Sequence, residues 1–294
     1  MISKQKKAIF FALLAAVLYA INSPFSKLLL DKIPAKMMAA FLYLGAGIGL
    51  FIFGMIQRAT GRREKELPLT KKELPYTVGM VVLDIAAPIF LMIGLTMTTA
   101  ANASLLNNFE IVATSIIALM IFKETISKRL WLAIVLVTVS SIILSFEDMS
   151  SLSFSLGSIF VLLACVCWGF ENNCTRMLSS KNPLEIVVIK GFGSGLGSLV
   201  IAFVTGESLP SLIFIFCALL LGFVAYGLSI YFYIYAQRDL GAAKTSAYYA
   251  AAPFVGAGLS LIIFHEIPSV TYIVALLIML AGTYFASSDT SKSE

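Results

Sequence analysis

The chain has 294 residues, of which 59% are hydrophobic and only 13% charged, and its formal net charge is +5. Soluble globular proteins are about half apolar and about one quarter charged, so this composition is typical of a membrane protein. The basic residues stand in short clusters between long apolar blocks, which argues against a nucleic-acid-binding surface. We therefore expect an integral membrane protein, surrounded by a lipid bilayer, that binds no nucleic acid.

Ten apolar blocks follow one another, most of them long enough to cross a hydrocarbon layer about 30 Å thick. The blocks are continuously apolar rather than alternating, and a helix satisfies its own backbone hydrogen bonds, so helices are favoured over strands. The predicted spans are residues 8–30, 36–57, 74–97, 101–122, 129–146, 155–178, 184–205, 210–236, 243–264 and 268–286. The first block lacks a convincing cleavage site and is expected to remain as a span. The predicted fold class is an all-α integral membrane protein with ten transmembrane helices.

The distribution of lysine and arginine predicts the orientation of these spans. With the N-terminus inside the cell, seventeen of the 21 basic residues fall on the inner side. The outer half then keeps only Lys27, Lys32, Lys36 and Lys190. Cytoplasmic loops carry the excess of basic residues, so we expect a multi-pass protein of the cytoplasmic membrane with both termini in the cytoplasm.

The cysteines and the single histidine do not predict a metal centre. All four cysteines, Cys165, Cys167, Cys174 and Cys217, fall inside apolar blocks, and His265 lies far away at the end of a span. A structural zinc site needs more ligands at short spacings. We expect the cysteines to pack as small apolar groups, and we expect neither a metal nor another cofactor.

An internal repeat divides the predicted spans into two sets of five. A shift of 142 positions lays the fourth and fifth spans on the ninth and tenth, and places Phe122-x-Glu124 on Phe264-x-Glu266. A shift of 149 positions places Tyr19-Ala20 on Trp168-Gly169. Five is an odd number, so the second set crosses the membrane inverted relative to the first, as in many secondary transporters. The predicted units are residues 1–148 and 149–294.

Two polar segments inside the spans carry a family resemblance. The first span contains Leu18-Tyr19-Ala20-Ile21-Asn22-Ser23-Pro24, and the sixth contains Cys167-Trp168-Gly169-Phe170-Glu171-Asn172-Asn173. With the two Phe-x-Glu joints, each followed by an aromatic residue (Trp131 or Tyr272), they resemble the drug/metabolite transporter superfamily, specifically its EamA family of ten-helix transporters. The resemblance covers nearly the whole chain. It implies metabolite or amino-acid transport, more often export than uptake, and leaves the substrate open. Tyr19-Ala20 departs from the usual Trp-Gly.

Three carboxylates, Asp84, Glu110 and Glu171, lie within predicted spans. A charge at the centre of a bilayer costs roughly 2.5–3.5 kcal/mol on insertion scales, so such groups normally face the interior of a bundle or a wet cavity. Glu171 is the strongest candidate for function, because it could bind a substrate ammonium group or exchange protons. The alternative is a structural ion pair between Glu171 and Arg176 or Lys190.

The fourth span carries a polar face. Ser104, Asn107, Glu110 and Thr114 are three or four residues apart and so share one side of a helix. The shift of 142 pairs Asn107 with Tyr249, so one wall of a cavity would be polar and acidic and the other aromatic. An interhelical hydrogen bond is the structural alternative for Glu110.

The repeat shifts add further candidates for the pathway. Asn22 is the repeat mate of Glu171, and Tyr226 is the repeat mate of Asp84, which stands one turn before Pro88. The predicted substrate or proton pathway consists of Glu171, Glu110, Asp84, Asn107, Asn22, Asn172, Trp168, Tyr226 and Tyr249, with no catalytic residue and no metal ligand.

A secondary transporter that works by alternating access is the function these features favour. No Walker-type nucleotide motif is present, so coupling would come from protons or from a substrate gradient. Three acidic groups and several aromatic residues favour a small substrate with a cationic amine, such as an amino acid or a polyamine. A quaternary-ammonium, multidrug or choline-type cation transporter is the alternative. We expect a monomer or a weak dimer.

Two other classes of membrane protein are less well supported. An intramembrane lipid-modifying enzyme would need a metal-binding His-Glu pair or paired aspartate motifs near a headgroup, and the sequence contains neither. An ion channel usually needs oligomeric symmetry or a selectivity filter. The protein is therefore expected not to be an enzyme.

Overall fold

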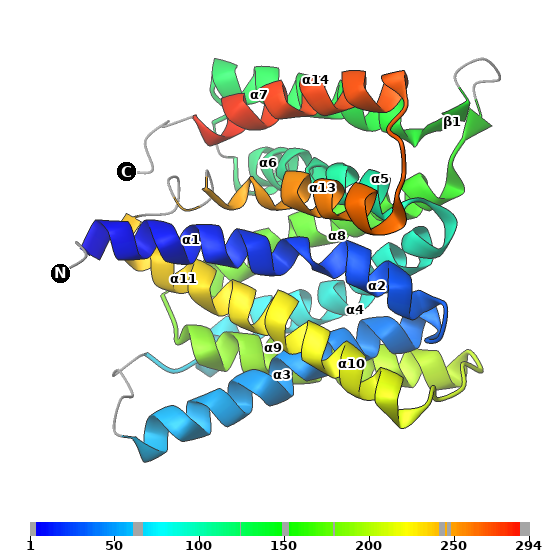
Figure 1. The fold of residues 1–294 in the computed structure, drawn as a ribbon. Helices are drawn as coiled ribbons and strands as arrows, with labels where there is room; N and C mark the ends of the chain where they lie inside the picture. The colour runs from blue at the N-terminus through cyan, green and yellow to red at the C-terminus, as the bar shows by residue number, and fades with distance from the viewer. Residues whose placement is uncertain are drawn as a thin grey trace.

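The computed structural model describes residues 4–60, 67–123, 125–148, 153–178, 180–240, 245 and 248–288. Nearly all of these residues lie in helices that pack side by side as one bundle, with both chain ends at the same end of the bundle (Figure 1). The first half contains α1 (Lys4–Ala20), α2 (Asn22–Leu30), α3 (Ala35–Ala59), the 3-10 turn η1 (Lys71–Glu73), α4 (Leu74–Met97), α5 (Ala100–Leu106), α6 (Phe109–Phe122) and α7 (Lys128–Ser145). The second half contains α8 (Leu156–Leu178), α9 (Pro183–Val204), α10 (Leu212–Gly222), the π-helix η2 (Phe223–Leu228), α11 (Ser229–Leu240), α13 (Ala252–Phe264) and α14 (Val270–Ser287).

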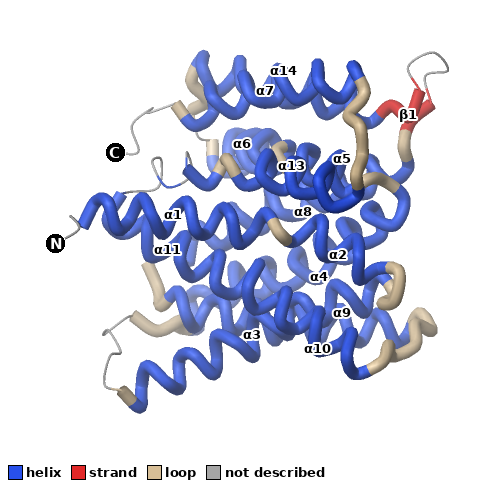
Figure 2. The backbone as a smooth tube through the Cα atoms, viewed as in Figure 1, coloured by secondary structure: helices blue, strands red, loops and turns tan. Residues whose placement is uncertain are grey.

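The ten-helix fold is confirmed. Among the described residues, nine helical stretches are long and apolar enough to cross a membrane, and the shorter apolar helix α13 provides the remaining pass. Two short strands, β1 (Phe146–Asp148) and β2 (Ser153–Phe154), pair antiparallel at the end of the bundle away from the chain ends (Figure 2). The predicted ninth span begins at residue 243, and its first residues lie mostly outside those described.

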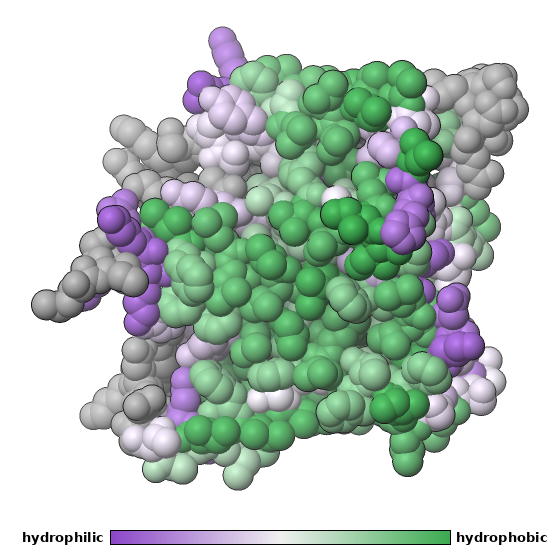
Figure 3. Space-filling model, viewed as in Figure 1, coloured by the Kyte–Doolittle hydropathy of each residue, from purple (hydrophilic) through white to green (hydrophobic). Residues whose placement is uncertain are grey.

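An apolar belt surrounds the middle of the bundle. In Figure 3 the centre of the visible face is hydrophobic, and the hydrophilic residues gather at its two ends. Large apolar side chains such as Phe51, Val135 and Leu196 are each at least half exposed. In water so large an apolar surface would be unfavourable, whereas lipid tails solvate it, so the belt marks the membrane-embedded part of the molecule.

Small residues let α3 and α9 approach closely. A Cβ atom on Gly191 of α9 would collide with the backbone N and Cα of Gly47 on α3. A Cβ atom on Gly47 would lie 2.9 Å from the backbone N of Phe192. Because lipid provides no hydrophobic force between helices, close backbone packing of this kind is a main source of their association. The contact joins the second helix of each predicted unit.

The loops tie the same two helices together at both ends of the bundle. Between α9 and α10, the carboxylate of Glu207 accepts hydrogen bonds from the backbone N–H groups of Lys36 (3.3 Å) and Met37 (2.9 Å) in the first turn of α3. At the opposite end, Glu185 in the first turn of α9 accepts a 3.2 Å bond from the backbone N–H of Leu69. Each loop thus contacts the first turn of a helix in the other half. Glu207 accepts from N–H groups of α3 that lack helical partners, whereas the loop at Leu69 donates its own N–H to the side chain of Glu185.

Several spans are interrupted near the middle, where the sequence predicted continuous helices. A turn at Ile21 separates α1 from α2, and a turn at 107–108 separates α5 from α6. In the first case Pro24 has no N–H to donate to the carbonyl of Ala20, four residues earlier. The eighth span passes through the π-helix η2, and a turn at 250–251 precedes α13.

The joints between the last two helices of each half have matching geometry. Lys123 and His265, which are 142 positions apart, are the two non-glycine residues with positive φ among those described, at 55° and 53°. Ser127 and Ser269, also 142 apart, both cap the next helix with φ −68° and ψ 161°. Glu124 lies outside the described residues. This agreement supports the proposal that the chain consists of two related units.

The close approach of α3 and α9 leads to a prediction about stability. We expect Gly191→Ala to destabilise the protein by about 1–3 kcal/mol, because the added methyl group must push the two helices apart. Gly258→Ala is the matched control, since apart from its own stretch of helix no atom lies within 4 Å of the position where its Cβ would be. Thermal unfolding of the purified variants in detergent measures the difference. Equal melting temperatures for the two variants would contradict the assigned packing.

Candidate functional site

A buried ion-pair cluster lies where helices of the two halves meet. Lys190 on α9 places its Nζ atom 3.0 Å from Oδ2 of Asp84 on α4 and 2.9 Å from Oε1 of Glu171 on α8. The exposed fractions of Asp84, Glu171 and Lys190 are 0%, 2% and 8%. Charges removed from water in this way need partners with good geometry, and removing one partner of such a pair typically costs about 3–5 kcal/mol.

Lys190, which was counted with the outer basic residues from the sequence, lies inside the bundle rather than in a loop. The structure buries it in the second turn of α9, between two carboxylates. Its flexible stem reaches the bundle interior, where both oxygens compensate the positive charge. The ion pair with Glu171 is the structural alternative that the sequence left open. A single lysine inside an apolar span was the signal for this role.

Polar aromatic side chains extend the cluster toward the broken first span. The hydroxyl of Tyr43 on α3 donates a 2.9 Å hydrogen bond to Oδ1 of Asp84. The ring of Tyr43 lies 5.1 Å from that of Tyr226, and Nδ2 of Asn22 donates to the Tyr226 hydroxyl at 3.1 Å. Ser26 in turn donates to Oδ1 of Asn22 at 3.1 Å. Asn22 follows the turn at Ile21, and Tyr226 lies in the π-helix, so both belong to interrupted spans.

Glu110 forms a second polar contact between the halves. Its Oε1 accepts a 2.6 Å hydrogen bond from Nδ2 of Asn172, which also contacts Oγ1 of Thr114 at 3.2 Å. Asn172 is the neighbour of Glu171 on α8, yet it contacts α6 rather than α9. The helix break leaves Glu110 in the first turn of α6, where the helix dipole favours a negative group.

A tyrosine wall, formed by Tyr19, Tyr226 and Tyr249, stands beside these polar groups. The ring centroid of Tyr19 lies 6.0 Å from that of Tyr226 and 5.8 Å from that of Tyr249. The hydroxyls of Tyr249 and Ser229 are 3.3 Å apart, and Ser229 donates to the backbone carbonyl of Ala15. The wall is therefore built from α1, from the π-helix η2 and from the residues just before α13.

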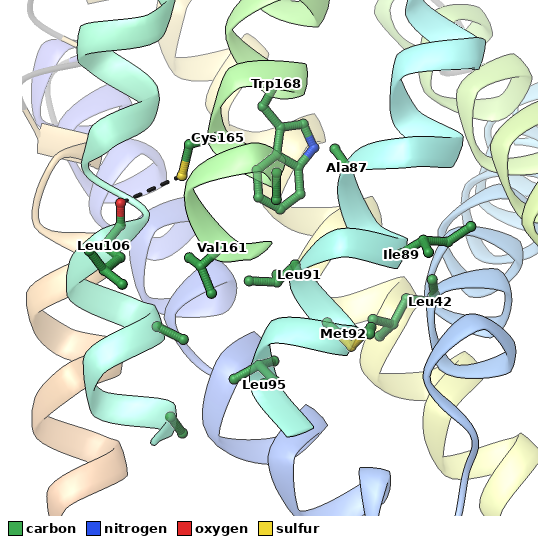
Figure 4. Close-up of a cluster of buried hydrophobic side chains, with 14 of the residues drawn as sticks. Leu42, Ala87, Ile89, Leu91, Met92, Leu95, Leu106, Val161, Cys165 and Trp168 are labelled. Carbon is green, nitrogen blue, oxygen red and sulfur yellow. Dashed lines mark hydrogen bonds between the residues drawn. The ribbon is translucent and has the colours of Figure 1, made fainter. Parts of the chain in front are cut away.

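The remaining predicted residues have different surroundings. Asn107 is buried at the break between α5 and α6, and its Oδ1 has no hydrogen-bond partner among the described residues. Trp168 is buried in the hydrophobic core beside Ala87 of α4 (Figure 4). About one helical turn earlier on α8, the thiol of Cys165 contacts the backbone carbonyl of Leu106. Trp168 thus packs in the core, and its side chain also hydrogen-bonds that of Tyr43, which links it to the ion-pair cluster. The Oδ1 atom of Asn107, by contrast, is a hydrogen-bond acceptor without a partner among the described residues.

The structure brings most of the predicted pathway residues together and adds three that the sequence analysis missed. Tyr43 and Tyr19 were not predicted, because an aromatic residue in an apolar span looks like ordinary packing. Lys190 was named only as a possible structural partner of Glu171 and not as a pathway residue. A cavity of about 380 Å³ lies elsewhere, lined by residues such as Phe109, Ser141 and Leu162. None of the predicted pathway residues lines that cavity, so it is separate from the polar site.

Comparisons with known proteins agree with this architecture. The chain is 26% identical over 292 residues to an uncharacterized transporter of Methanothermobacter thermautotrophicus, and the match covers 92% of this chain and 83% of the relative. It is 23% identical over 227 residues to the uncharacterized transporter YyaM of Bacillus subtilis, covering 74% of each protein. A solved crystal structure superimposes with a TM-score of 0.68 over 98% of this chain and 99% of the other, at 15% identity, which shows a shared fold.

The family assignment rests on the sequence model of one family. That model, described as the EamA-like transporter family, matches residues 6–146 and 155–288, which together cover most of the chain. The two matched segments are separated by the β1–β2 connection, between the fifth and sixth spans. With its ten-helix bundle, its buried charges and these matches, the chain belongs to the EamA-like transporter family of membrane transporters.

Proposed function

We propose that the protein is a secondary transporter for a small metabolite with a cationic amine, such as an amino acid. It acts in the cytoplasmic membrane by alternating access, with the two five-helix units, residues 1–148 and 149–294, rocking around the buried polar site. Both termini face the cytoplasm, and export is the preferred direction. The observation that carries this proposal is the surplus of buried acidic groups over basic ones where the two units meet.

The surplus follows from the contacts of each carboxylate. Asp84 and Glu171 share the single ammonium group of Lys190. Glu110 makes no salt bridge among the described residues and is hydrogen-bonded by the neutral amide of Asn172. Three carboxylates therefore face one lysine, and the unbalanced charge favours either a bound cation or bound protons. A substrate ammonium group and a proton are the two species that can fill this role.

The groups around the acidic residues favour an amine that carries hydrogen atoms on its nitrogen. Carboxylates and the free acceptor of Asn107 offer hydrogen-bond acceptors that a primary ammonium group can use, whereas a quaternary one cannot. The tyrosine wall favours any cation with an apolar part, through cation–π contact and burial. A quaternary-ammonium or choline-type cation is therefore the second candidate, supported by the aromatic rings alone.

Alternating access is supported by the matching joints and by the reciprocal loop contacts between the units. In inverted-repeat transporters the substrate site lies near the bilayer midplane, at broken helices between the repeats. The breaks at Ile21, at 107–108 and at 250–251, together with the π-helix η2, surround the candidate site in this way. The names of the relatives, which are uncharacterized transporters, support transport without indicating a substrate.

We expect Glu110→Gln to weaken amine binding by about tenfold or more, because a hydrogen bond to a charged group contributes about 1.5–3 kcal/mol. A thermal-shift screen with amino acids, polyamines and quaternary amines first identifies a ligand, and calorimetry then compares affinities. Asp31→Asn, at an exposed carboxylate beyond α2, is the control and should bind normally. Equal affinity of Glu110→Gln and the control would remove Glu110 from the substrate site.

Proton coupling gives a separate prediction. In liposomes, a pH gradient should drive amine transport by the wild-type protein, because a buried carboxylate can take up a proton on one side and release it on the other. Glu171→Gln cannot ionise, so the transport that it retains should follow the amine gradient and ignore an imposed pH gradient. Retention of the pH response by a folded Glu171→Gln variant would exclude Glu171 as the proton carrier.

A further inference from the structure

The role of Lys190 follows from the number of charges at the ion-pair cluster. Asp84 and Glu171 bring two negative charges, and Lys190 brings one positive charge within 3.0 Å and 2.9 Å of their oxygens. The other oxygen of Asp84 accepts from the neutral hydroxyl of Tyr43, and Glu171 also accepts from Thr175. When both carboxylates are ionised, they carry one unit of buried negative charge that Lys190 does not compensate.

We propose that Lys190 sets the number of cationic groups that the ion-pair cluster of Asp84 and Glu171, as distinct from Glu110, accepts from its ligand. Two buried carboxylates require two cationic partners, and Lys190 permanently supplies one of them. The ligand supplies the other, so the site selects a substrate with one ammonium group at this position. This inference rests on the proposed function, because it takes the ligand to be an amine.

The chemistry of Lys190 suits this role better than it suits a purely structural link between helices. Its ammonium group is the same chemical group as a ligand amine, on a flexible stem that can make room beside the two oxygens. Its partners come from both halves of the chain, Asp84 from α4 and Glu171 from α8. Movement of the halves would therefore change how the two carboxylates share their cations.

A purely structural role of Lys190 and a role in setting the charge of the ligand predict different ligand affinities for the double variant. Asp84→Asn leaves Glu171 and Lys190 as a neutral pair, so it should lose affinity for a monoamine by about tenfold or more. The double variant Asp84→Asn with Lys190→Gln restores one uncompensated carboxylate and should regain that affinity. Lys190→Gln alone leaves two uncompensated carboxylates and should shift its preference toward a diamine.

The experiment compares 1-aminobutane with 1,4-diaminobutane, which have the same carbon chain and differ by one ammonium group. Calorimetry on the full-length proteins in detergent gives the ratio of the two dissociation constants for the wild type, Asp84→Asn, Lys190→Gln and the double variant. We expect the ratio to move toward the diamine by about tenfold in Lys190→Gln and to return to the wild-type value in the double variant. The regained monoamine affinity of the double variant supports the inference even where Lys190→Gln does not fold.

Failure of this inference and failure of the proposed function give different results. A wild-type protein that binds monoamines, with a double variant that stays as weak as Asp84→Asn, would overturn the role of Lys190 and leave the amine substrate intact. A folded Lys190→Gln variant with an unchanged ratio would do the same. A wild-type protein that binds other amines of the thermal-shift screen but neither of these two would overturn the role of Lys190 alone. A wild-type protein that binds no amine at all would overturn the proposed function and the role of Lys190 with it.

Discussion

The pairing of two buried carboxylates with a single ammonium group is the constraint around which the rest of the structure is arranged. Asp84, Glu171 and Lys190 come from three helices and hold each other in an apolar belt where a lone charge would be costly. The tight glycine contact between α3 and α9 and the loop contacts at both ends fix the helix that carries Lys190. Packing and electrostatics therefore depend on each other in this bundle.

The interruptions of the spans explain why polar groups gather beside this ion pair. A continuous helix satisfies its backbone internally and offers only side chains, whereas a break in the membrane leaves backbone and side-chain groups that need partners. Asn22, Asn107 and Tyr249 all lie at or next to such breaks, and Tyr226 lies in a π-helix, a feature that is frequent at functional sites. The lipid-facing belt, by comparison, is mostly apolar.

The fold could be predicted largely from the lengths of the apolar blocks, because only helices can cross lipid as separate segments. Each carboxylate could be identified as a candidate from the sequence, because a charge inside a membrane span is costly and must have a structural or functional partner. The sequence left two possible partners for Glu171 and gave none for Asp84, because span order does not say that α4 lies against α8 or α3 against α9. The break at 107–108 also lacked the glycine or proline that usually marks one, and so the polar face of the fourth span was predicted as one helix.

The most direct test of the account asks whether the polar site opens to both sides of the membrane. Thr114 is half-buried and accepts a hydrogen bond from Asn172, so a cysteine there reports on the site. In a variant without the native cysteines, we expect a membrane-impermeant thiol reagent to label Thr114→Cys from either side, and bound amine to reduce that labelling. Val135→Cys, in the lipid-facing belt, should stay unlabelled. Labelling of Thr114→Cys from one side only, or from neither, would contradict alternating access around these carboxylates.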